Sequence, residues 1–208
     1  MKKSTPLSVR VLHFLTQFSF WAITVLTAAT LVFNTWITFT DVDLDAQLNI
    51  AMPFSFDVVE TGTLTYDGIE KEVNISEAFG KIELVDTPYP ITKIVARSLL
   101  IVLLFFLYMM HKARGFMKAI KKGDYFNPYN FLKLKQFASA LFAFAIFYQG
   151  YFVYLGQFVL KDLQFESIKI SYELREISGL LLTALIIWVI SHVFQRGARM
   201  QRELDRTI

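Results

Sequence analysis

Residues 112–135, KARGFMKAIKKGDYFNPYNFLKLK, lie between two long apolar runs and decide how the rest of the chain is arranged. The stretch carries seven lysines and arginines against one acidic residue, Asp124. Short loops with this bias stay on the cytoplasmic side of membrane proteins, according to the positive-inside rule. With this connector inside, the apolar runs on both sides of it become membrane spans, and the N-terminus and C-terminus are both expected in the cytoplasm.

The composition supports a membrane protein. Of 208 residues, 54% are hydrophobic and 21 are phenylalanine, and the apolar residues are concentrated in a few long runs. The net charge of +3 is the sum of a strongly acidic segment and several basic ones. The chain has no cysteine, which excludes disulfides, thiolate metal sites and a cysteine nucleophile.

The apolar runs divide the chain into alternating membrane and water-exposed segments. The first run continues to Phe39 and is longer than the ~7–15 residues of a signal-peptide core, which favours an uncleaved helix over cleavage near Ala28. The expected order is a cytoplasmic N-terminus and first span at 1–39, an extracytoplasmic β-rich segment at 40–90, a second span at 91–111, a basic cytoplasmic connector at 112–130, a third span at 131–160, an extracytoplasmic loop or strand at 161–176, a fourth span at 177–195 and a basic cytoplasmic tail at 196–208.

The segment 40–90 is expected to form a small antiparallel sheet. It holds eleven acidic residues against two lysines, so it lies in water. Asp67-Gly68 between two alternating runs is a strong β-hairpin signal, because a type I′ turn needs two positive φ angles. Residues 44–59 and 81–85 are further strand candidates, and residues 165–172 alternate well enough to add a strand from the loop between the third and fourth spans. The predicted fold class is therefore an all-α membrane protein with four transmembrane helices and this small extracytoplasmic sheet.

Three patterns that could mark a ligand or metal site are weak. Asp41, Asp43 and Asp45 alternate like calcium ligands, but the glycine and glutamate that complete an EF-hand loop are absent. The three histidines of the chain lie at similar predicted depth and could gather into a haem, metal or pH-sensing site, yet no acid or thiol is paired with them by motif. Because no phosphate loop, serine elbow or HExxH motif occurs either, we expect no enzymatic activity, no cofactor and no metal. The histidines are His13, His111 and His192.

Two cations, Lys93 and Arg97, lie near the outer end of the second predicted span. The side chain of Arg97 is long enough to reach the headgroups, and an interfacial anchor is the simplest interpretation. The alternative is a membrane ion pair between Arg97 and an acid that opens the fourth span, Glu173 or Glu176, with Glu176 as the candidate. Along the first span, Thr16, Thr27, Thr30 and Asn34 fall near one side, which predicts a packing face against the other helices.

Two stretches resemble one protein family. Lys121-Lys122-Gly123-Asp124-Tyr125-Phe126-Asn127, followed by Asn130 and Leu132, resembles the connector of the bacterial membrane proteins grouped as domain of unknown function (DUF) 2975. Residues 187–208 are similar to that family's ending, a helix exit of Phe, a basic residue and Gly before an "LTV"-like terminus, although Arg206 departs from it. The resemblance implies a four-pass bacterial inner-membrane protein without assigned activity. Members are often encoded beside small helix-turn-helix regulators, which implies a cytoplasmic protein partner.

The sequence thus favours a sensory or regulatory membrane protein, with an immunity protein or an accessory transport subunit as the alternative. Most of the connector lysines set orientation, so we expect no direct nucleic-acid binding. Expected partners are the bilayer, anionic headgroups at the basic tail, a cytoplasmic protein and a second copy of the chain. The candidate partner-binding residues lie in the connector turn and the tail: Lys121, Lys122, Gly123, Tyr125, Phe126, Asn130, Arg196, Gly197, Arg199 and Arg202.

Overall fold

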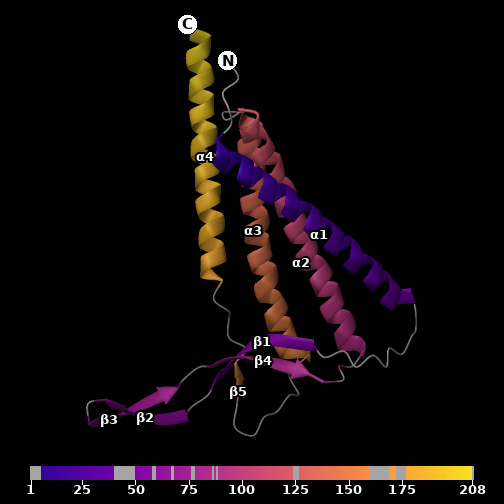
Figure 1. Ribbon diagram of the computed structural model, residues 1–208, viewed down its shortest axis with the longest axis vertical. Coiled ribbons are helices and arrows are strands. Elements are labelled where there is room, and N and C mark those ends of the chain that lie inside the picture. Colours follow the sequence, from indigo (N-terminus) through magenta and orange to yellow (C-terminus); the bar gives the residue numbers. More distant parts are fainter. Residues whose placement is uncertain are drawn as a thin grey trace. The chain divides into compact units, whose positions relative to one another are not determined.

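The computed structural model describes residues 6–39, 50–57, 60–66, 68–75, 78–85, 87, 89–123, 127–159, 169–171 and 177–207 (Figure 1). The chain forms two compact units. The helical unit comprises Met1–Asp41, Val95–Tyr148 and Glu176–Ile208, and the β-rich unit comprises Val42–Ile94 and Gln149–Arg175. Each unit is described by itself below.

Four long helices confirm the predicted fold class. They are α1 (Leu7–Phe39), α2 (Tyr89–Lys121), α3 (Pro128–Tyr154) and α4 (Ser178–Thr207), and a π-helical turn, η1 (Leu155–Val159), follows α3. By length and composition, all four helices can cross a membrane. At 1.5 Å per residue, the 33 residues of α2 extend about 50 Å. Since the hydrocarbon core is about 30 Å thick, α2 continues well beyond a single crossing and includes the first half of the basic connector.

A polar face joins α1 to α2, as the spacing of its hydroxyl residues predicted. Thr27 and Thr30 are buried, and each hydroxyl donates to the carbonyl four residues before it, so burial leaves neither group unsatisfied. One turn further on, Asn34 Nδ2 donates to the carbonyl oxygen of Ala96 on α2 at 3.1 Å. Hydrogen bonds of this kind hold helices together where both helices face lipid and no water is displaced on contact.

Aromatic rings form contacts between α2 and α3. Phe105 of α2 lies 5.7 Å from Phe144 and 5.6 Å from Phe147, measured between ring centroids. Aromatic pairs at such distances stabilise the packing of the two helices. On α3, Ala138 and Ala145 are almost fully buried.

The outward faces of the helices are apolar and exposed. On α1, for example, Phe14 is 69% exposed and Val25 is 67% exposed, and Val193 of α4 is 63% exposed. Apolar surface on this scale is unfavourable in water and is the natural surface for lipid acyl chains. The helical unit is therefore that of a multi-pass membrane protein.

The β-rich unit contains two separate antiparallel pairings. Strand β1 (Ile50–Asp57) pairs along its length with β4 (Ala78–Leu84), and β5 (Lys169–Ser171), from the loop before α4, adds to the other edge of β1 in the order β4-β1-β5. The predicted strand from that loop is thus confirmed. Asp41, Asp43 and Asp45 lie outside the described residues.

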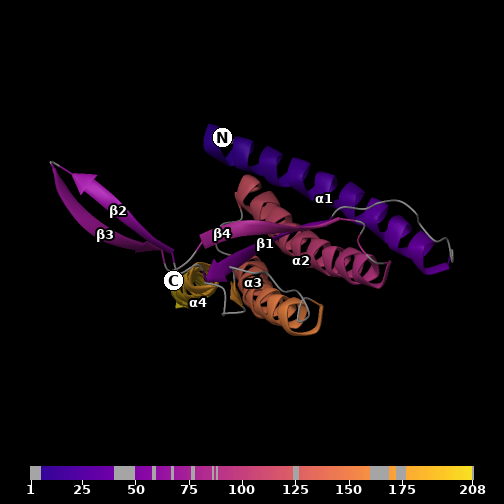
Figure 2. The ribbon, with the colours of Figure 1, turned by 90° about the horizontal axis from the view of Figure 1, so that it is seen from below.

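The predicted hairpin is confirmed as well, but it is not part of the three-stranded sheet. Strands β2 (Glu60–Tyr66) and β3 (Ile69–Ile75) pair only with each other and form a separate ribbon (Figure 2). Tyr66 faces Ile69 across the turn, and Gly68 has a φ of 74°, the conformation for which glycine was expected.

Candidate interaction site at the basic end of the helices

The turn between α2 and α3 is formed by local capping. At the end of α2 the N–H of Gly123 donates to the carbonyl of Ile120 at 2.9 Å, and Gly123 has a φ of 80°, which is a glycine C-cap. At the start of α3 the N–H of Tyr129 donates to Asn127 Oδ1 at 3.1 Å. Asn127 is thus the N-cap and Pro128 the first helical residue, as the sequence predicted.

The connector residues proposed for partner binding have different surroundings. Lys121, Lys122 and Gly123 are exposed at the end of α2. Asn130 is only 2% exposed, which leaves little of its side chain for a partner. Its position in the first turn of α3, where its N–H donates to the carbonyl of Asn127 at 2.9 Å, indicates a structural role. Tyr125 and Phe126 lie outside the described residues.

The basic tail continues the fourth helix. Gly197 lies within α4, which runs without a break to Thr207, so the helix does not end at this glycine (Figure 1). Arg196 and Arg199 are exposed, and Arg202 lies in the same helix. The 30 residues of α4 extend about 45 Å, again more than one crossing of the hydrocarbon core requires. Residues 196–207 are thus a helical continuation of the fourth span.

The start of α3 and the basic part of α4 are in contact. Phe131 stacks on Phe194, with ring centroids 5.6 Å apart and an interplanar angle of 9°. Lys135 Nζ lies 5.7 Å from the ring centroid of Trp188. Because Phe131 follows the connector turn and Phe194 precedes Arg196, these contacts bring together the two stretches in which the candidate partner-binding residues lie.

A hollow of about 320 Å³ lies between the last turns of α2 and the first turn of α3. We call it the basic hollow, because its described lining contains three lysines, one arginine and one histidine and no carboxylate. Its lining residues are His111, Lys112, Arg114, Gly115, Lys118 and Lys133.

Gly115 leaves room for a lysine of α3 at the basic hollow. Lys133 Nζ donates to the carbonyl oxygen of Gly115 at 3.3 Å, so the lysine stem lies across the glycine. A Cβ at position 115 would come within 3.2 Å of Lys133 Cδ, and the flexible lysine stem would have to shift by a few tenths of an ångström.

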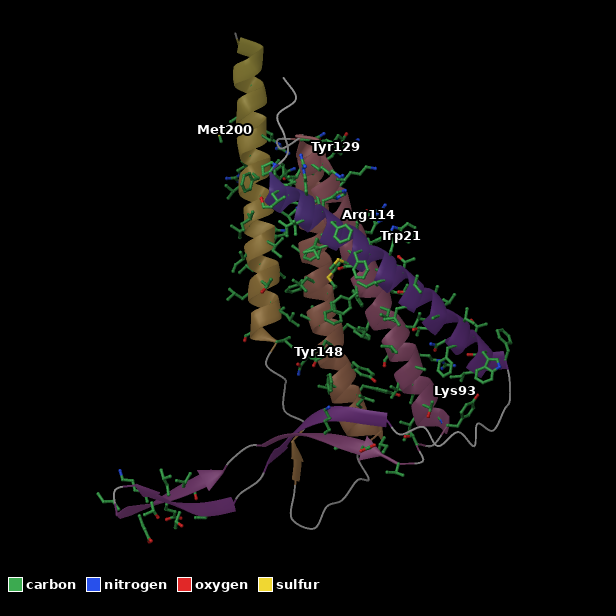
Figure 3. The ribbon with its side chains drawn as sticks, viewed as in Figure 1. Trp21, Lys93, Arg114, Tyr129, Tyr148 and Met200 are labelled. Carbon is green, nitrogen blue, oxygen red and sulfur yellow. The ribbon has the colours of Figure 1, made fainter. Side chains whose placement is uncertain are left out.

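The first helix contacts Arg114, one of the residues that line the basic hollow, through two aromatic rings. The guanidinium of Arg114 lies 4.6 Å from the ring centroid of Phe20 and 5.8 Å from that of Trp21 (Figure 3). Cations over aromatic faces are stabilised by the ring quadrupole, which orients Arg114 without neutralising its charge. His111 lies 6.1 Å from Phe20, measured between ring centroids.

The sequence analysis did not identify the basic hollow. Positions 111, 114, 115 and 118 recur every three or four residues, the spacing that places side chains on one helix face. That spacing was the available signal. The contribution of Lys133 depends on how closely α3 approaches α2, and no local pattern encodes that distance.

The other candidate residues do not form sites in the described part of the chain. The three histidines have separate surroundings: His192 stacks on Trp188, His111 lies beside Phe20, and no group of three His, Cys, Asp or Glu residues that could hold a metal is present among the described residues. Arg97 is exposed, and Glu176 lies outside the described residues, so their pairing stays a prediction.

The comparisons with known proteins identify a family. Neither a curated protein nor a solved structure matches the chain. The profile of the family described as "Protein of unknown function (DUF2975)" matches residues 73–208, from strand β3 through α2, α3 and α4. The match therefore begins earlier than the second span, where the sequence resemblance was placed. Since it covers well over half of the chain and includes both the connector and the tail, the chain belongs to the DUF2975 family.

Proposed function

We propose that this protein is a non-enzymatic regulatory protein of the bacterial inner membrane, which couples an extracytoplasmic β-rich unit to a cytoplasmic protein partner. The observation that supports it is the course of α2, a single helix of 33 residues that begins in the β-rich unit at Tyr89 and ends at the basic Lys121. Because α2 belongs in part to each unit, the chain connects the two units directly at this helix.

The orientation follows from charge. Lys112, Arg114, Lys118 and Lys121 lie on the last turns of α2, whereas the strands before that helix carry exposed acids such as Glu70 and Glu72. The positive-inside rule puts the basic end in the cytoplasm and the β-rich unit outside. The proposed sensory surface is then the β-rich unit.

The proposed docking surface combines the end of α2 with the basic part of α4. Lys121, Lys122, Arg196 and Arg199 are all exposed, and the Phe131–Phe194 stack holds their two stretches together. Four exposed cations suit an acidic protein surface, and they would increase the association rate with such a partner. The partner we propose is the small helix-turn-helix regulator that family members often have as a genetic neighbour.

The experiment is co-purification of that regulator with the full-length membrane protein. Replacing Arg196 and Arg199 with glutamine should reduce the recovered regulator at least about fivefold, since both lost charges belong to the docking surface. The matched control removes two exposed lysines of the β-rich unit, Lys71→Gln with Lys81→Gln, and should leave recovery unchanged. No recovery with the unmodified chain, together with unchanged output of the regulator when the gene is deleted, would refute the proposal.

One observation favours the alternative, an accessory subunit of a transport or immunity system. A cavity of about 640 Å³ lies between α3 and α4, and it is lined by small and large side chains such as Ala138, Phe142 and Leu185. A helix of another membrane protein could occupy it. A deletion strain that becomes sensitive to membrane-active peptides while the regulator's output stays constant would support this alternative against the regulatory function.

A further inference from the structure

The basic hollow concentrates positive charge that the described part of the chain leaves unbalanced. Lys112, Arg114, Lys118 and Lys133 all line it, and the one hydrogen bond that their side chains donate among the described residues is the bond from Lys133 to the carbonyl of Gly115. Asp124, the one acid of the connector, lies outside the described residues. Like charges held this close repel one another, and an anion in the hollow would offset that repulsion.

A second observation comes from α1. His13 Nδ1 is buried and has no hydrogen-bond partner among the described residues. The positive charges of Lys121, Arg114 and Lys118 act on this histidine, which therefore lies near the same group of cations although it belongs to a different helix.

The basic hollow adjoins apolar surface. Lys112 Nζ lies 4.9 Å from the ring centroid of Tyr108. Tyr108 also lines a second hollow of about 610 Å³ between α2 and α3, together with Leu104, Phe105 and other mainly apolar residues; we call it the apolar hollow. The Lys112–Tyr108 contact thus shows that the basic hollow lies next to the apolar hollow. A phospholipid, with a charged headgroup and attached acyl chains, suits such a pair of neighbouring hollows.

The position along α2 fits a headgroup as well. Lys93 and Arg97 lie near the start of the helix, and the run from Ser98 to Met110 carries no charge. The cations of the basic hollow follow directly after this run, where an apolar span gives way to the headgroup region.

We propose that the basic hollow binds the phosphoryl group of an anionic phospholipid, whose acyl chains lie along the apolar hollow. The guanidinium of Arg114 is a planar donor suited to two phosphoryl oxygens, and the lysine ammonium groups add charge-assisted hydrogen bonds. Inorganic phosphate carries the same chemistry without the chains, and the experiment separates these two sources. The proposal is independent of the regulatory function proposed above.

The test is calorimetric titration of the purified full-length protein in a neutral detergent. The probes are dihexanoyl phosphatidylglycerol, dihexanoyl phosphatidylcholine and inorganic phosphate. We expect phosphatidylglycerol to bind at least about tenfold more tightly than either of the others, because only it combines a net negative headgroup with acyl chains. Equal affinity for phosphatidylglycerol and inorganic phosphate would contradict the lipid as the source.

The variant that tests the location is Arg114→Gln with Lys118→Gln. It should weaken phosphatidylglycerol binding at least about tenfold, since two charge-assisted contacts are lost. The matched control, Lys71→Gln with Lys81→Gln, removes the same charge from exposed positions of the β-rich unit and should change the dissociation constant less than about threefold. Equal weakening by both pairs would show general surface electrostatics and overturn the proposal.

A third variant guards against loss of folding. Arg114→Lys with Lys118→Arg keeps both charges and should keep most of the affinity, apart from the loss of two-oxygen binding at position 114. If this variant binds like the unmodified protein while the glutamine pair does not, the effect is due to charge. If the charge-preserving variant loses binding as completely as the glutamine pair while retaining its helical circular dichroism, the proposed phosphoryl site is wrong.

Discussion

The acidic segment before α2 and the basic connector after it are both highly charged, but the structure arranges their charges differently. On the hairpin, Glu70 and Glu72 are exposed and extend from a ribbon that pairs only with itself. At the other end of α2, cations from two helices surround one hollow. Dispersed charge keeps a segment in water, whereas charges from several elements that face one space can bind an ion.

The difference has a geometric origin. In a strand, residues two apart share a face, so Glu70 and Glu72 lie on the same face of β3, where both are exposed. In a helix, residues three or four apart share a face, and a second helix can add a further charge if a small residue allows it to approach. Gly115 has that function for Lys133.

The largest expected effect comes from removing the Phe131–Phe194 stack at the basic end of the helices. Phe131→Ala removes a ring that is 5% exposed and stacked on Phe194, and it should lower the free energy of unfolding by about 3 kcal/mol. Unfolding by denaturant in detergent measures this change. Phe14→Ala, which truncates a ring that is 69% exposed on α1, should change stability by less than about 0.5 kcal/mol. Equal effects would show that the α3–α4 contact does not hold the basic end together.

In the acidic segment, the turn of the β2–β3 hairpin is expected to be the position most sensitive to substitution. Gly68 has a φ of 74°, so Gly68→Val introduces backbone strain of about 1–3 kcal/mol and should open the hairpin without unfolding the helices. Hydrogen exchange of the β2 and β3 amides is the measurement. The control is Gly62→Val in the middle of β2, where a Cβ would meet nothing closer than the carbonyl of Val73 at 3.9 Å. Faster exchange in the control than in Gly68→Val would contradict the turn assignment.

A smaller effect is expected where neither charged region is involved. Asn34→Leu removes the hydrogen bond from α1 to the carbonyl of Ala96 and should cost about 0.6–1.7 kcal/mol, the range for such bonds between membrane helices. Thr35→Val is the control, because the Thr35 hydroxyl donates only to Leu31 within its own helix. Unfolding in mixed detergent micelles compares the two. If the variants prove equally stable, the polar face does not join α1 to α2.

The elements of this fold could be predicted because their signals are local. Long apolar runs gave the four helices, Asp67-Gly68 gave the hairpin turn, and Asn127-Pro128 gave the start of α3. Each depends on residues within a few positions of one another, where turn chemistry and helix capping are strong.

The arrangement of those elements could not be predicted. Nothing in the alternation of β1 specifies β4 and β5 as its neighbours while β2 and β3 pair alone, because strand pairing depends on contacts distant in sequence. Likewise, the sequence gives the number of connector cations but not their convergence, which depends on Gly115 and on the approach of Lys133. The candidate site in the connector and tail stays a prediction, and the stack of Phe131 on Phe194 supports its two parts acting together.

The most direct test of the account is the side of the membrane on which each charged region lies. The chain has no cysteine, so single cysteines can be introduced at two exposed positions, Glu70→Cys on the hairpin and Lys122→Cys at the end of α2. A membrane-impermeant thiol reagent applied to intact cells should label position 70, and label position 122 only after the cells are permeabilised. Labelling of both positions in intact cells, or of position 122 alone, would contradict the proposed separation of the acidic and basic regions by the membrane.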